Sequence, residues 1–206
     1  MARKRVGNKR EKIIAAAAKF FGEKGYHNTT TAEVAEAAGV AAGTIYIYFS
    51  SKEDLLVAVF EEFLERHMAR LRDGVEKEVG PEAKLRRLII LGLALMEENP
   101  DSARIFLSQL RQSTTMIKTV AKRSSRAYRS IIESILDEGI RTGVFRPMDS
   151  RAVAAMVFGS FQNLVLDWVA DDCSYRLTGL GDEATTYILR GAACPEQPGD
   201  SAAGRA

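Results

Sequence analysis

Apolar side chains recur along most of the chain at the three- and four-residue spacing of amphipathic helices, and no segment alternates as a strand does. The first pattern covers residues 11–24 and stops at Gly25. Two shorter patterns follow over residues 31–38 and 42–49, separated by Gly39. The sequence therefore predicts three N-terminal helices, the second and third joined by a tight turn.

Longer helical patterns fill the rest of the chain. The run Ser50-Ser51-Lys52-Glu53 has the spacing of a capping box, in which Ser50 caps and Glu53 reaches back, and it predicts a long helix to about residue 78. Pro81 opens the next helix, because proline is tolerated in a first turn. The later helices are expected over residues 81–99, 101–110, 114–140, 149–170 and 182–192. The pattern thus predicts an all-α fold of about nine helices.

The composition is that of a globular protein, with 46% apolar and 27% charged residues. No apolar run reaches the length of about 18 residues that a membrane span needs. The basic N-terminus leads into further charged residues rather than an apolar segment, so no secretory signal is predicted. Two cysteines are too few for a disulfide framework, and a cytoplasmic protein is the expectation.

The charge is unevenly distributed, although its net value is only +2. Residues 1–12 hold six of the 29 basic residues and one of the 27 acidic ones, a net charge of +5, which leaves −3 for the rest. A basic arm on a slightly acidic body is typical of an end that binds a polyanion. An ordinary solvated terminus explains the same charges equally well.

Residues 34–49 supply the parts of a helix-turn-helix, which needs two short helices packed at a steep angle. Gly39 permits the left-handed turn, and the surrounding alanines permit close approach of the helices. The second helix, residues 42–49, is then the one that enters the major groove of DNA. Its aromatic residues could instead be mere core, as is expected of Phe49. The small core of the motif is formed by Val34, Val40 and Ile45.

Residues 30–40 (TTAEVAEAAGV) and 43–56 (GTIYIYFSSKEDLL) closely resemble the signature of the TetR family of transcription regulators. The resemblance implies a regulator that binds double-stranded operator DNA as a homodimer, because one recognition helix reads only one half-site. It also implies that the last two helices of each subunit form a four-helix dimer bundle. The expected division is a DNA-binding domain with its arm (1–50), a ligand-binding and dimerisation domain (51–194) and a disordered tail (195–206).

The resemblance also assigns DNA contacts residue by residue. Positions that contact phosphates are matched by Thr31, Thr44, Tyr48 and Lys52. Positions that face bases are matched by Ala42, Gly43, Tyr46 and Ile47. Arg3 and Arg5 in the arm are left to follow phosphates or to enter the minor groove. Because few of these side chains offer paired hydrogen bonds, readout would rest on contacts with thymine methyl groups and on close backbone approach.

The rest of the chain offers a basic stripe and apolar residues for a ligand pocket. Five basic residues are spaced to lie near one helical face: Arg111, Lys118, Lys122, Arg126 and Arg129. The candidate pocket residues are Phe63, Leu93, Met96, Phe106, Leu110, Phe158, Gln162 and Leu166. A basic rim on an apolar tunnel would suit a long acyl chain tipped by phosphates, whereas a solvated charged face explains the stripe without any ligand.

Three further segments resemble the acyl-CoA-responsive repressors of fatty-acid degradation within the TetR family. They are residues 110–113, 135–143 and 156–159, together with Trp168 and Val169. This resemblance implies a repressor of β-oxidation genes that has no cofactor and leaves its operator when long-chain acyl-CoA fills the pocket. It places Arg111 and Lys118 near the CoA phosphates.

Other functions are weighed against the same residues. An enzyme is not expected, because the chain has only two histidines, His27 and His67, and no glycine-rich phosphate loop, nucleophile elbow or metal-binding cluster. A regulator of drug efflux stays open, since sensors of flat cations use buried acids and Glu97, Glu98 and Asp167 would serve. A regulator gated by a protein rather than by a ligand also stays open.

Overall fold

The computed structural model describes residues 2–100, 103–104 and 115–194. Its helices are α1 (Ala2–Lys24), α2 (Thr31–Ala37), α3 (Ala42–Tyr48), α4 (Lys52–Glu76), α5 (Pro81–Glu97), α7 (Thr115–Arg141), α8 (Ser150–Ala170), the 3-10 helix η1 (Leu177–Leu180) and α9 (Gly181–Ala192). Within these ranges extended pairing is limited to one antiparallel bridge between Phe145 and Ala193. The predicted all-α fold is confirmed, while most of the expected helix over 101–110 and the whole tail lie outside the described residues.

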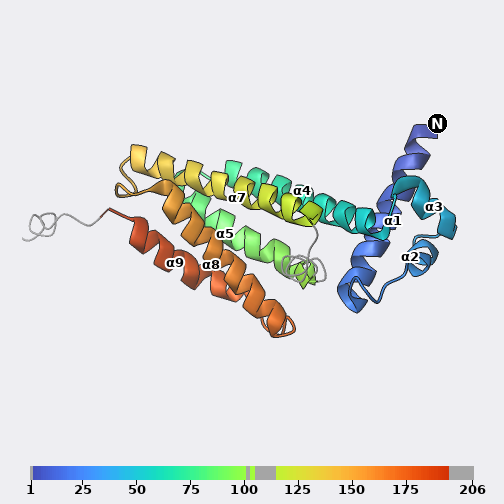
Figure 1. The fold of residues 1–206 in the computed structure, drawn as a ribbon. Coiled ribbons are helices and arrows are strands. Elements are labelled where there is room, and N and C mark those ends of the chain that lie inside the picture. The colour runs from blue at the N-terminus through green and yellow to red at the C-terminus, as the bar shows by residue number, and fades with distance from the viewer. Residues whose placement is uncertain (1, 101–102, 105–114, 195–206) are drawn as a thin grey trace, which may run out of the picture.

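The first three helices and the start of α4 share one core, and we call α1–α3 the head (Figure 1). Ile13, Val34 and Ile45 are each 0% exposed and bring α1, α2 and α3 together. Phe49 is 5% exposed and belongs to this core, as expected. Burying four side chains of this size stabilises the head by several kcal/mol, at roughly 2 kcal/mol each.

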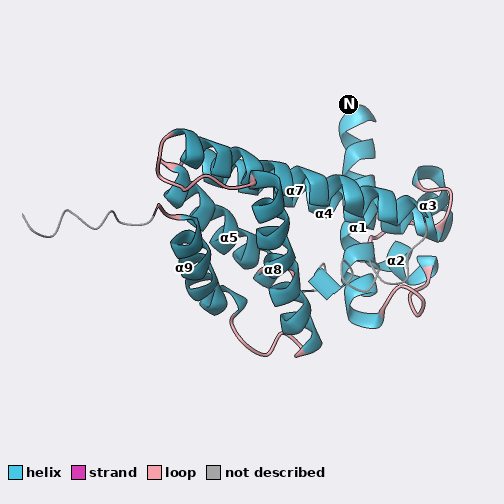
Figure 2. Ribbon diagram, turned by 60° about the vertical axis from the view of Figure 1, so that its left-hand side comes forward, coloured by secondary structure: helices cyan, strands magenta, loops and turns pink. Residues whose placement is uncertain are grey.

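A second core fills the body, which we define as α5, α7, α8, η1 and α9 with the second half of α4. There α7 lies against α4 and α8, and α5 lies against α4 and α9 (Figure 2). The buried indole of Trp168 donates its Nε1 hydrogen to the carbonyl of Tyr175 at 2.8 Å. The buried hydroxyl of Tyr128 donates to the carbonyl of Leu88 at 3.3 Å. Both polar groups are therefore satisfied inside an apolar core.

Helix α4 joins the head to the body and contributes to both cores (Figure 1). Its residues up to Leu64 pack in the head core, and those from Met68 to Val75 pack in the body core. Phe63 is partly buried and contacts both clusters. Because a helix is a stiff element, any change in the direction of α4 moves the head relative to the body.

Two predicted helix boundaries were wrong. Helix α1 begins at Ala2 rather than at residue 11, so the basic arm is helical. The cap of α4 is shifted by one residue, because Ser51 rather than Ser50 accepts the backbone N–H of Asp54, at 3.0 Å. Asp54 rather than Glu53 reaches back to the backbone N–H of Ser50, at 3.2 Å. Two serines and two acids stand in succession, so Ser50 and Ser51 are each followed three residues later by an acid, and the local pattern does not fix which serine caps.

Helix α8 is long and apolar enough to cross a membrane by length and composition, with a mean hydropathy of 1.4 over a window of which 28% is buried. It is capped, as predicted, by Asp149, whose carboxylate accepts the backbone N–H of Ala152 at 3.0 Å. One face, including Phe161 and Trp168, is buried in the body core. The opposite face is exposed and mixed, with Met156 70% exposed among small residues and with Ser160, Asn163 and Asp167 along the same side. These contacts place α8 in the helical body and leave Met156 uncovered on its outer side.

Candidate DNA-binding and effector-binding sites

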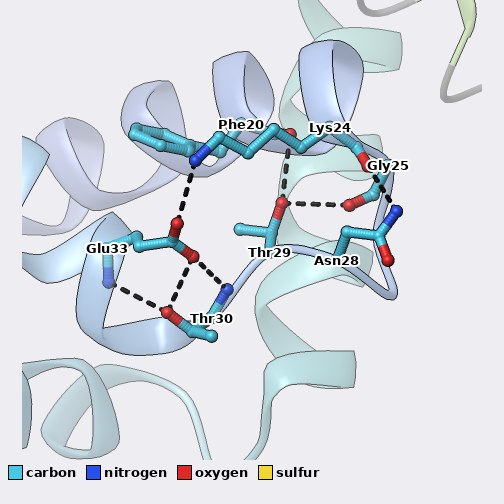
Figure 3. A network of polar contacts seen from close by, with 7 residues as sticks. All are labelled: Phe20, Lys24, Gly25, Asn28, Thr29, Thr30 and Glu33. Carbon is cyan, nitrogen blue, oxygen red and sulfur yellow. Dashed lines mark hydrogen bonds and ion pairs between the residues drawn. The ribbon is translucent and has the colours of Figure 1, made fainter.

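The first turn of α2 is fixed by a capping box (Figure 3). The hydroxyl oxygen of Thr30 accepts the backbone N–H of Glu33 at 3.2 Å, and the Glu33 carboxylate accepts the backbone N–H of Thr30 at 2.8 Å. The ammonium of Lys24 at the end of α1 donates to the same carboxylate at 2.9 Å. The hydrogen bond from Lys24, and to a smaller extent those from Thr30, lower the pKa of Glu33 to about 2. The carboxylate therefore ties α1 to α2 while it caps α2.

In the turn between α1 and α2, side chains donate hydrogen bonds to backbone carbonyls (Figure 3). The buried hydroxyl of Thr29 lies 3.1 Å from the carbonyl oxygen of Phe20 and 2.9 Å from that of Gly25. The amide of Asn28 donates to the carbonyl of Lys24 at 3.0 Å. Gly25 has φ +80°, a left-handed conformation that glycine adopts without strain. These contacts end α1 and set the direction in which the chain enters α2.

Helix α3 presents an uncharged outer surface across a glycine turn. Gly39, at the turn, has φ +66°, and Ile45 anchors α3 with 0% exposure. On the outer side Tyr46 is 57% exposed and Ile47 is 79% exposed. Ala42 and Gly43 are also exposed, so all four residues assigned to bases lie at the surface. An exposed isoleucine with glycine and alanine beside it offers methyl contacts and close backbone approach rather than hydrogen bonds.

The residues assigned to phosphates differ in exposure and in their contacts within the head. The hydroxyls of Thr31 on α2 and Tyr46 on α3 lie 3.1 Å apart and form a hydrogen bond. This contact directs the Tyr46 hydroxyl towards α2, beside a phosphate-assigned residue. Thr44 and Tyr48 are half-buried, and Tyr48 packs partly against the head core.

Lys52 is held beside the first turn of the head. Its ammonium lies 4.4 Å from the ring centroid of Tyr26 and 3.4 Å from the carbonyl oxygen of His27. Burial lowers the pKa of Lys52. Arg10 on α1 lies with its guanidinium 5.6 Å from the ring centroid of Phe49. Arg10 was counted in the basic arm, but its contact with Phe49 and the contact of Lys52 with Tyr26 were not predicted, because only the fold brings each cation to its ring.

The arm residues Arg3 and Arg5 lie on α1, but their side chains fall outside the described part of the structure. The same holds for Lys118 on α7, and Phe106, Leu110 and Arg111 lie outside it altogether. The remaining residues of the basic stripe are on α7: Lys122 and Arg126, both exposed, and Arg129, half-buried.

The candidate pocket residues that are described do not share one environment. Leu93 and Met96 on α5 are 0% and 4% exposed, and Phe158 on α8 is 8% exposed, all in the body core. Gln162 and Leu166 on α8 are half-buried. Phe63 on α4 lines a groove of about 550 Å³ between the head and the body.

Helix α3 has seven residues, and its outward side chains are not used by the protein's own core. Insertion into the major groove requires that arrangement, so the class is that of helix-turn-helix DNA-binding proteins. The family model described as "Bacterial regulatory proteins, tetR family" matches residues 13–59, and "YsiA-like protein, C-terminal region" matches residues 60–191. The chain belongs to the TetR family of bacterial regulatory proteins. The predicted class of DNA-binding regulator, rather than enzyme, is confirmed.

Several relatives match nearly the whole chain. It is 31% identical over 180 residues to the fatty acid metabolism regulator protein of Bacillus subtilis strain 168, covering 87% of this chain and 93% of that protein. The structure of the fatty acid degradation regulator FadR from Bacillus halodurans is 33% identical, with a TM-score of 0.80, covering 88% of this chain and 98% of that one. FadR from Bacillus subtilis, solved in complex with stearoyl-CoA, is 31% identical with the same TM-score and coverages.

Proposed function

We propose that the protein is a cytoplasmic repressor of fatty-acid degradation genes that leaves its operator when a long-chain acyl-CoA binds. The similarity to the Bacillus subtilis regulator carries this proposal, because it extends over the head and the body alike. That relative was solved with stearoyl-CoA. The N-terminal half of α7 is basic, with Lys122 and Arg126 exposed, and it lies beside an apolar body. Such a surface suits a ligand that consists of an acyl chain with phosphates at one end.

The active form is a homodimer whose interface includes the exposed sides of α8 and α9. Met156 on α8 and Tyr187 on α9 are 70% and 71% exposed, and Leu180 just before α9 is 39% exposed. Large exposed apolar side chains on the last two helices of the body mark a surface that a second subunit can cover. A dimer places two α3 helices on successive major grooves, about 34–36 Å apart.

Release from DNA is a linkage between the two sites. An effector that prefers a head spacing unsuited to DNA weakens operator binding by its differential affinity for the two arrangements. Helix α4 is the lever, because it contributes to both the head core and the body core.

The test is operator binding measured with and without effectors. A high-affinity sequence is first selected from random DNA, and binding is then followed by fluorescence anisotropy with palmitoyl-CoA, lauroyl-CoA, free CoA, palmitate and a cationic dye. Palmitoyl-CoA should release the DNA and raise the midpoint of thermal unfolding, because a ligand of the native state stabilises it by mass action. Release by the dye alone, or by none of these compounds, would contradict the proposed effector and leave the DNA-binding class intact.

A further inference from the structure

A groove lies where the head meets the body. It has a volume of about 550 Å³ and is lined by residues from the middle of α1, the centre of α4 and the end of α5. Its apolar surface includes Ile14 and Ala18 from α1, Phe63 from α4 and Leu95 from α5. Both α1 and α5 pack on α4, and the groove lies between the first helix of the head and the end of α5 in the body.

A buried imidazole faces this groove. His67 lines the groove and is 5% exposed. Its ring centroid lies 5.7 Å from that of Phe63, and no hydrogen bond to its nitrogens is formed within the described residues. Burial, with the charge of Arg70 adding to it, lowers the pKa of His67 to about 4. At neutral pH the ring is uncharged and has one N–H donor and one acceptor available.

Two arginines stand at the rim of the groove, one turn apart on α4. Arg66 pairs with Glu62, and Arg70 pairs with Glu98 at the end of α5, with 3.2 Å between Nη2 and Oε1. The two arginine side chains are 72% and 52% exposed. A guanidinium has five N–H donors, and a paired carboxylate uses two at most, so both arginines keep donors for a second anion.

We propose that this groove binds the phosphopantetheine arm of the acyl-CoA effector, with Arg66 and Arg70 on its diphosphate and His67 donating to the nearest amide carbonyl. This assignment rests on the proposed function. The amide carbonyl next to the diphosphate is a few bonds from it, which suits groups one helical turn apart on α4. The thioester lies farther along the arm, so the acyl chain continues past Phe63, which contacts both cores.

Occupation of the groove explains how the ligand acts on the head. The arm fills the space between α1 and α5 and so fixes the position of α1 against the body. Arg70 keeps its ion pair with Glu98 at the end of α5 and binds the diphosphate with its remaining donors, so the arm is held beside α5. The bound arm thereby favours one arrangement of the head, which is what linkage to DNA release requires.

The experiment measures palmitoyl-CoA affinity by titration calorimetry in four forms of the full chain. His67→Phe keeps a buried aromatic ring and should weaken binding about three- to tenfold, the effect of one lost hydrogen bond. Arg70→Ala should weaken it about tenfold or more, because a charge-assisted bond is stronger. Arg86→Ala is the matched control. Arg86 forms a similar exposed ion pair, with 3.3 Å between its Nη1 and Oδ1 of Asp182, and this pair does not line the groove. The Arg86→Ala variant should bind palmitoyl-CoA as the wild type does. Operator affinity without ligand should be the same in all four.

A second measurement does not depend on these variants. Ala15 on α1 is exposed and lines the groove, and Ala32 on α2 is exposed outside it. Palmitoyl-CoA should slow alkylation of Ala15→Cys at least fivefold and leave Ala32→Cys unchanged, with each site read by peptide mass spectrometry so that Cys173 and Cys194 do not interfere.

Three results are decisive. Weakened binding in both groove variants together with protection at position 15 supports the groove. Wild-type affinity in His67→Phe and Arg70→Ala, or unprotected Ala15→Cys, overturns the groove and leaves acyl-CoA as effector. A wild-type protein that binds no palmitoyl-CoA overturns both.

Discussion

The capping box of α2 is the feature of the head whose removal has the most direct measurable effect. Thr30→Ala removes the hydroxyl that accepts the backbone N–H of Glu33 and donates to its carboxylate at 2.8 Å. Loss of such a cap costs about 1 kcal/mol. Helix α2 has only seven residues, far fewer than the roughly 12–15 at which an isolated helix becomes marginally stable in water. The cap is therefore a large part of what keeps α2 formed.

A loss of about 1 kcal/mol raises the population of the opened helix about fivefold. Amide hydrogen exchange across residues 33–38, followed by mass spectrometry, should therefore become about fivefold faster in Thr30→Ala. Operator affinity should change by less than twofold, because the opened state stays rare. Thr30→Ser keeps the hydroxyl and should restore wild-type exchange.

The matched control is Thr142→Ala at the other end of the molecule, where the hydroxyl donates to the carbonyl of Glu138 at 2.9 Å. It should leave exchange in α2 unchanged. Wild-type exchange in Thr30→Ala, or faster exchange in Thr30→Ser as well, would refute the reasoning that the hydroxyl caps α2.

Three further changes test the rest of the molecule. Tyr48→Phe should weaken operator binding about three- to tenfold with an unchanged melting temperature, and unchanged affinity would exclude a phosphate contact by its hydroxyl. Ile47→Ala removes a side chain that is 79% exposed, so stability should shift by no more than about 0.5 kcal/mol while discrimination at one base pair relaxes, as competition with single-base operator variants would reveal. The wild type should lose up to about 3 kcal/mol of stability as pH falls from 6.5 towards 4, because the unfolded histidine takes up a proton in that window and buried His67 does not. His67→Phe should not show this loss. Denaturant midpoints at successive pH values measure it, and parallel curves for the two proteins would contradict the buried neutral ring.

The fold was predictable because the chain combines strong helical periodicity with clear punctuation. Gly25 and Gly39, which end the first two helical patterns, both have positive φ in the structure. The position of the α4 cap was not predictable, since Ser50 and Ser51 are each followed three residues later by an acid. The local pattern therefore offers two caps one residue apart and does not choose between them.

The candidate sites were predictable only in part. The exposure of Ile47 follows from the helix pattern, but the bond between Thr31 and Tyr46 joins residues 15 positions apart and depends on the angle between two helices. Leu93 lies in the body core, and periodicity cannot separate core from pocket because both need apolar side chains. The burial of His67 did have a signal, because it falls on the same helical face as buried leucines four and three residues away.

Helix α3 carries no charged side chain between Ala42 and Tyr48, and this separates two properties of DNA binding. The logarithm of affinity falls with the logarithm of salt concentration by about 0.9 per phosphate neutralised. We expect the neutralising cations to come from α1 and from Lys52, because α3 has none. Rising ionic strength then weakens binding to operator DNA and binding to random DNA by the same factor. The ratio between them is set by uncharged contacts, so the selectivity of the regulator stays nearly constant in a cell whose internal salt concentration changes.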